Sequence, residues 1–209
     1  MKIEKLAAKP DRAGRYLIRF EDGSTMRLYR QTVQDHGLYA GVELSQEQIS
    51  ALRVDAGQMS AKMRAVRIVA ASNVSKDDLQ QRLIRKGEDP RQAAEAVNWM
   101  EELNLVDDRE TAAQIVSRCA GKGYGIARAK QALYEKRIPK EYWEEALEDY
   151  PDQTERIAQF LRDRLTPDSD ERVRKRAIDA LLRRGHSYGD IRAALRQLDF
   201  DEFQEEWNG

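Results

Sequence analysis

The feature that most constrains the fold of this chain is an internal repeat of helix, glycine-containing turn and helix. The central copy runs from Leu105 to Lys136 and carries the turn Gly121-Lys-Gly-Tyr-Gly125. Similar patterns precede and follow it, with apolar residues at equivalent positions: Leu79, Ala129 and Ile191, then Leu83, Leu133 and Leu195. One copy alone buries little apolar surface. We therefore expect neighbouring copies to stack into an elongated, curved array.

The first 57 residues follow a different pattern. Residues 14–20 and 24–29 are β-type runs joined by Glu21-Asp-Gly23, and an Asp-Gly pair between such runs is a strong hairpin signal. The pattern also predicts a third strand over residues 3–6 and a short helix over residues 33–39. Residues 45–48 have the form of a capping box that opens another helix. The sequence predicts a small β-rich module over residues 1–57, with Gly57 near its boundary.

Helical periodicity starts at Met59 and continues along the rest of the chain. The fold class predicted is mainly α: a three-helix repeat over 58–107, a second over 108–150, and a connecting helix plus a third repeat over 151–209. The apolar positions predicted to face the core include these residues: Ala65, Val66, Val69, Ala70, Ala93, Val97, Met100, Leu103, Ala112, Ile115, Val116, Cys119, Val173, Ala177, Leu181, Leu182, Phe200, Phe203 and Trp207.

Composition and residue placement argue against catalysis. The chain has one cysteine, Cys119, and its two histidines, His36 and His186, fall in different modules. This pattern favours no metal site, no cofactor and no nucleophilic chemistry. Asp107-Asp108 precedes a helix, where an N-cap role fits better than a metal site. No apolar run approaches the length of a membrane span, so a cytoplasmic protein is expected.

The formal net charge of −1 conceals strong segregation of charge. Residues 111–140 hold seven Lys or Arg against one Glu, and 141–170 hold ten acidic residues against three Arg. Residues 171–198 then hold eight basic against three acidic residues, and 199–209 hold five acidic residues and no basic one. Such blocks indicate distinct faces. One face would attract a polyanion, unless the blocks are solvated helix faces that pair with one another.

Two basic segments are the candidate binding sites. On the helix from Glu171 to Arg184, Arg172, Arg176 and Arg183 fall on the side opposite the apolar residues. The turn 121–125 is the second candidate; it lacks the features of a nucleotide-binding loop, and Tyr124 either stacks on a partner or seals the repeat. The complete candidate set is as follows: Lys122, Tyr124, Arg128, Lys130, Arg172, Lys175, Arg176, Arg183, Arg184, Arg192 and Arg196.

The repeats, together with Leu105-Val-Asp-Asp108, Lys86-Gly87, the turn 121–125 and Arg183-Arg-Gly-His-Ser-Tyr188, resemble the RecX family of recombinase regulators. The N-terminal strand module is similar to the extension that many members carry, so the resemblance covers nearly the whole chain. Three positions depart from the family pattern. Thr111-Ala112 stands where an aromatic is usual, Arg137 replaces the glycine of the second Lys-Gly pair, and His186 replaces an aromatic.

The resemblance implies a non-enzymatic regulator. Members bind the RecA recombinase filament on single-stranded DNA, lie in its helical groove, and restrain its ATPase, strand-exchange and coprotease activities. Weak direct DNA binding and a monomeric state are further expectations. The alternative, from another class, is a stand-alone DNA-binding module that uses basic helical faces. Steep salt dependence of its affinity for bare DNA would identify that alternative.

Overall fold

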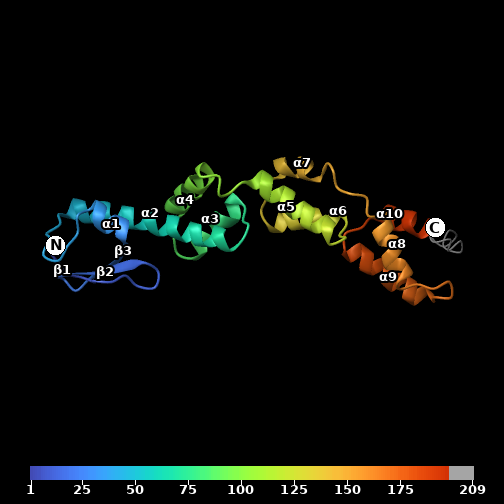
Figure 1. Cartoon of the computed structure of the whole chain (residues 1–209), viewed down its shortest axis with the longest axis horizontal. Helices are drawn as coiled ribbons and strands as arrows, with labels where there is room; N and C mark the ends of the chain where they lie inside the picture. Colours follow the sequence, from blue (N-terminus) through green and yellow to red (C-terminus); the bar gives the residue numbers. More distant parts are fainter. Residues whose placement is uncertain (198–209) are drawn as a thin grey trace. The chain divides into compact units, whose positions relative to one another are not determined.

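The computed structural model describes residues 1–197 and divides the chain into two compact units, Met1–Val106 and the residues from Asp107 onward. Within the described residues there are ten α-helices, one short 3₁₀ helix and a three-stranded antiparallel sheet (Figure 1). The mainly α fold with a β-rich N-terminal module is thus confirmed. Phe200, Phe203 and Trp207, predicted to form a last helix, lie outside the described residues.

The N-terminal sheet has the order β1-β2-β3, with β1 at Ile3–Leu6, β2 at Arg15–Phe20 and β3 at Thr25–Tyr29. The Asp22-Gly23 turn joins β2 to β3 as predicted, and Gly23 adopts a φ of 81° that glycine accepts without strain. Helices α1 (Arg30–Asp35) and α2 (Gln46–Ala71) lie on one side of the sheet (Figure 1). They bury one face of the sheet in a small core.

Helix α2 runs through the position near Gly57 where the sequence predicts a module boundary. Ser45 opens it with the predicted capping box, in which its hydroxyl accepts from Gln48 N at 3.1 Å. The helix then continues for 26 residues, so Gly57 lies inside it. Its first half packs under the sheet through Ile49 and Leu52, and its second half packs in the next core. One helix therefore serves both the β-rich module and the first repeat.

The first repeat is completed by α3 (Lys76–Arg85) and α4 (Pro90–Glu102). Ser75 caps α3 by accepting from Asp78 N, and Pro90 opens α4, both as predicted. Leu79, Leu83 and Met100 are fully buried between the helices. Leu103 was predicted to face this core, but it follows the end of α4 and is 48% exposed. The helix stops one residue before the apolar stripe does.

The second unit begins with α5 (Asp108–Gly121) and α6 (Ile126–Glu135). The short helix η1 (Lys140–Tyr142) and α7 (Trp143–Leu147) close this three-helix group. Asp107 caps α5, accepting from Arg109 N at 2.8 Å and Glu110 N at 3.1 Å, as its position before the helix predicted. Cys119 is buried in the core between these helices, also as predicted.

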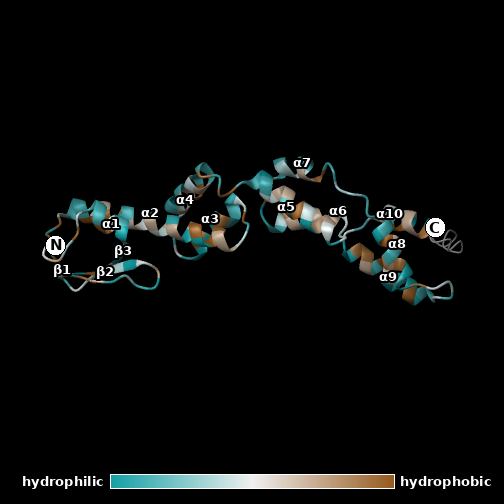
Figure 2. Cartoon of the chain, in the orientation of Figure 1, coloured by the Kyte–Doolittle hydropathy of each residue, from teal (hydrophilic) through white to brown (hydrophobic). Residues whose placement is uncertain are grey.

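The last described group consists of α8 (Thr154–Arg162), α9 (Glu171–Arg183) and α10 (Tyr188–Arg196). Alternating hydrophobic and hydrophilic segments along α9 mark it as amphipathic (Figure 2). Its buried residues are Ala177, Ile178 and Leu181, whereas Val173, predicted to be inward, is 38% exposed. The core-facing stripe is therefore rotated slightly toward Ile178, because α8 and α10 contact that side of the helix.

Candidate functional site

The second unit contains a close contact between two glycine turns, which we call the glycine junction: residues 121–125 and 183–187. The amide of Gly125 donates to Arg184 O at 2.9 Å, and the amide of Ala127 donates to Gly185 O at 3.2 Å. A Cβ at Gly125 would lie 2.0 Å from Gly185 O. Glycine is required here because two backbones approach each other directly.

The junction is also held by side chains. His186, 5% exposed, makes a 3.1 Å hydrogen bond to Gly123 O. A carbonyl can only accept, so Nε2 carries the proton, and the buried Nδ1 has no partner among the described residues. Burial lowers the pKa of His186, because the charged ring would lose its hydration. Arg156, from α8, donates to Ala120 O at 2.5 Å.

Tyr124 belongs to the repeat core rather than to an open binding surface. Its half-buried ring packs with the apolar residues of α5 and α6. Its carbonyl accepts from Tyr150 Oη at 2.7 Å, and burial raises the pKa of Tyr150 to about 12. Of the two roles left open for Tyr124, the structure supports sealing of the repeat.

The α9 basic stripe, defined as Arg172, Arg176 and Arg183, lies opposite the buried side of its helix. The three residues are four and seven positions apart, which places them on one side of a helix, and all three are exposed. Asp179 lies on the same side between Arg176 and Arg183, yet forms no ion pair with either. This carboxylate, one of the three acidic residues of the segment 171–198, lowers the net charge of this side of α9 by one.

Most of the candidate cations are available to an external anion. They are exposed and make no ion pair or side-chain hydrogen bond with another residue among positions 1–197. The members of this set are Lys122, Lys130, Arg172, Lys175, Arg176, Arg183, Arg192 and Arg196. Isolated cations on a helix surface contribute little to folding. Their charges are therefore not neutralised by a partner among the described residues; we call them the uncommitted cations.

Two further candidates are committed to neighbours. Arg128 forms an ion pair with Glu135 at 3.1 Å. Arg184 lies over the ring of Phe160 at 4.8 Å, and Arg164 lies over the same ring at 3.8 Å. Sequence reasoning missed Arg164, although its position four residues after Phe160 on the connecting segment could have indicated the contact.

The glycine junction brings part of the candidate set together. Arg184 O binds the amide of Gly125, and a Cβ at Gly185 would lie 2.7 Å from the Cβ of Arg128. The turn bearing Lys122 therefore meets the C-terminal end of the α9 basic stripe. The contacts described do not place Lys130, Arg192 or Arg196 at this junction.

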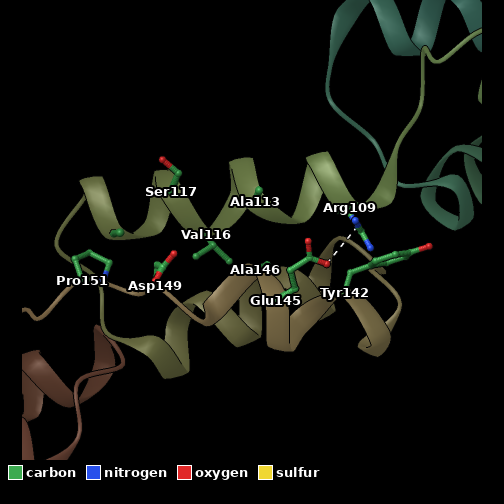
Figure 3. Close-up of a pocket in the computed structure, with 10 residues that line it drawn as sticks. Arg109, Ala113, Val116, Ser117, Tyr142, Glu145, Ala146, Asp149 and Pro151 are labelled. Atoms are coloured by element: carbon green, nitrogen blue, oxygen red, sulfur yellow. Dashed lines mark ion pairs between the residues drawn. The ribbon is translucent and has the colours of Figure 1, made fainter.

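A pocket of about 390 Å³ lies between α5 and the η1–α7 segment (Figure 3). Its lining includes the apolar Val116 and Ala146 and an ion pair between Arg109 Nε and Glu145 Oε2 at 3.3 Å. Among residues 1–197 no group of three or more His, Cys, Asp or Glu side chains is arranged to hold a metal ion. No helix in that range is long and apolar enough to cross a membrane.

The fold and these surfaces define a class of protein: helical, built from repeated three-helix groups, with exposed cations on the helices of its second unit. A family model, RecX second three-helix domain, matches residues 107–147, which span α5 to α7. The chain is 31% identical to the regulatory protein RecX of Chlorobaculum tepidum over 147 residues, covering 68% of this chain and 91% of that protein. It is 24% identical over 209 residues to the regulatory protein RecX of Clostridioides difficile, covering 97% of each.

Solved structures agree on the fold. A crystal structure of regulatory protein RecX matches with a TM-score of 0.65 at 21% identity, covering 93% of this chain and 98% of that one. The crystal structure of RecX from Lactobacillus salivarius matches with a TM-score of 0.60 at 23% identity, over 68% and 97%. The chain belongs to the RecX family of regulatory proteins.

Proposed function

We propose that this protein binds a RecA-type recombinase filament on single-stranded DNA and restrains its ATPase, strand-exchange and coprotease activities. It acts by occupying the filament and performs no chemistry of its own. The proposal places the protein in the cytoplasm as a monomer. Family membership supports the regulatory role, and the uncommitted cations of the second unit support binding to an anionic surface.

The α9 basic stripe is the observation that carries the proposal. Guanidinium groups bind phosphates and carboxylates through paired hydrogen bonds, so either the DNA or an acidic face of the recombinase can be the ligand. In the described fold the stripe has no such ligand of its own. Lys175 and Lys122, both exposed, extend the same charge along α9 and at the glycine junction.

Filament binding tests the proposal directly. Recombinase is assembled on a labelled single-stranded oligonucleotide with a nonhydrolysable ATP analogue, and the protein is titrated into it. The stripe variant is Arg172→Glu, Arg176→Glu, Arg183→Glu. The control trio is Arg53→Glu, Arg118→Glu, Lys140→Glu, at exposed positions that form no ion pair among the described residues. Both variants change the net charge by −6, so they differ only in where the charge is lost.

We expect wild type and the control trio to bind the filament, and the stripe variant to lose binding with unchanged helix content. If the stripe variant binds as wild type does, the stripe is a solvated face and the proposed contact is wrong. A stand-alone DNA-binding function remains the competing proposal. It predicts equal affinity for bare DNA and for the filament, with a steep fall in both as salt rises.

A further inference from the structure

The outward face of the N-terminal sheet carries a row of three cations, one from each strand: Lys5, Arg19 and Arg27. Lys5 lies directly opposite Arg19 in the β1–β2 ladder. Arg19 pairs with Thr25 and Leu17 pairs with Arg27 in the β2–β3 ladder, so Arg27 is the diagonal neighbour of Arg19. The three cations and their neighbours Leu17 and Thr25 are all exposed, whereas the opposite face of the sheet packs on α2.

This row does not stabilise the fold. Residues directly opposite on neighbouring strands have Cβ atoms about 5 Å apart, and like charges at that spacing repel. Among the described residues, none of the three cations forms an ion pair or a side-chain hydrogen bond. The exposed Glu4, next to Lys5, and the exposed Glu21, two residues after Arg19, pair with none of the three cations. An external anion would remove the repulsion.

We propose that this face, which we call the sheet cation row, binds the phosphates of single-stranded nucleic acid. A protein partner would need an exposed apolar anchor, and among the described residues this face offers Leu17, which is 37% exposed. Tyr29 falls on the same side by register, but it is half-buried and its hydroxyl accepts from Arg67 Nη2 at 2.9 Å. Phosphate binding needs only an array of cations, to which the Thr25 hydroxyl adds a hydrogen-bond donor. Leu17, beside Arg27, can contact a base that is not stacked in a duplex, which favours a single strand.

The inference does not depend on the proposed function, because it concerns the first unit and needs no recombinase. The test is binding of the full chain to a fluorescent oligothymidylate in the absence of recombinase, repeated over a range of salt. The row variant is Lys5→Gln, Arg19→Gln, Arg27→Gln. The matched control is Arg53→Gln, Arg118→Gln, Lys140→Gln, which removes the same charge from exposed sites elsewhere.

On single strands each phosphate contact contributes about 0.7 to the slope of log affinity against log salt, so the row variant should lose about 2 from that slope. The fall in affinity between about 50 and about 200 mM salt then becomes roughly 16-fold smaller than in wild type. The control should keep nearly the wild-type slope. Leu17→Thr should weaken binding and leave the slope unchanged.

Three outcomes would overturn the inference. The first is no binding of wild type to the oligonucleotide at low salt. The second is an equal loss of the salt slope in the row variant and in the control, because the effect would then come from the net charge of the protein and not from the position of the three cations. The third is equally tight, row-dependent binding of polyglutamate or of a duplex, which would contradict the assignment to single strands. The thermal melting temperature of each variant, compared with that of wild type, serves as the control that the sheet remains folded.

Discussion

Replacing Gly125 by alanine tests the physical basis of the glycine junction. Gly125 has a φ of −77°, which alanine adopts without strain, so any effect comes from the added methyl group. That methyl would lie 2.0 Å from Gly185 O and 2.4 Å from His186 N, both backbone atoms that no side-chain rotation can move. The two turns must separate.

Separation breaks the hydrogen bonds from Gly125 N to Arg184 O and from Ala127 N to Gly185 O. Each bond has one partner in a buried residue, Gly125 N in the first and Gly185 O in the second. A buried hydrogen-bonding group left unpaired costs about 1–3 kcal/mol, so the loss of both bonds should lower the free energy of unfolding by about 3 kcal/mol. For a unit of this size such a change lowers the melting temperature by roughly 10 °C or more.

Urea and thermal unfolding followed by circular dichroism measure this effect. The control is Gly121→Ala, at the end of α5, where a Cβ meets no atom within 4 Å. It should be neutral or stabilising by up to about 1 kcal/mol, since alanine is the better helix former. If Gly125→Ala unfolds at the same midpoint as wild type, the backbone contact between Gly125 and Gly185 does not hold the two turns together.

Three further predictions concern single residues. Burial lowers the pKa of His186 in the folded state, so the unfolded chain binds more protons and stability falls as the pH drops below about 6.5. Unfolding midpoints at pH 7.5 and 5.5 should show this loss of stability, and the loss should be smaller in His186→Gln. If wild type and His186→Gln lose the same stability between the two pH values, His186 is not the titrating group. Burial also raises the pKa of the Cys119 thiol, so native protein should react slowly with a thiol reagent and Ser117→Cys quickly, whereas equal rates would contradict the burial. Arg137 has a φ of 55°, so Arg137→Gly should raise the free energy of unfolding by about 1 kcal/mol, and a lower midpoint would contradict a strained backbone at that position.

The repeat could be predicted from sequence because its core positions recur at helical spacing. Leu79, Ala129 and Ile191 take equivalent places in three groups and all are buried. The hairpin and the helix cap could also be predicted, because the Asp22-Gly23 turn and the Ser45 cap depend only on residues close in sequence. The fold class therefore follows from short-range patterns.

The continuity of α2 and the glycine junction could not be predicted in the same way. Glycine disfavours a helix, so the sequence predicts a boundary near Gly57. The cost is only about 1 kcal/mol, and the packing of α2 before and after Gly57 keeps this residue helical. The contact between Gly125 and Gly185 joins residues 60 positions apart, and no local pattern records it. The sheet cation row likewise depends on strand register, which sets Lys5 opposite Arg19.

Recombinase regulation can be measured as single-stranded-DNA-dependent ATP hydrolysis by a RecA-type recombinase, titrated with wild type, the stripe variant and the control trio. The proposal predicts inhibition by wild type and by the control trio at stoichiometric levels, and none by the stripe variant. Unchanged hydrolysis with wild-type protein would contradict recombinase regulation. Inhibition by all three proteins would contradict the role given to Arg172, Arg176 and Arg183.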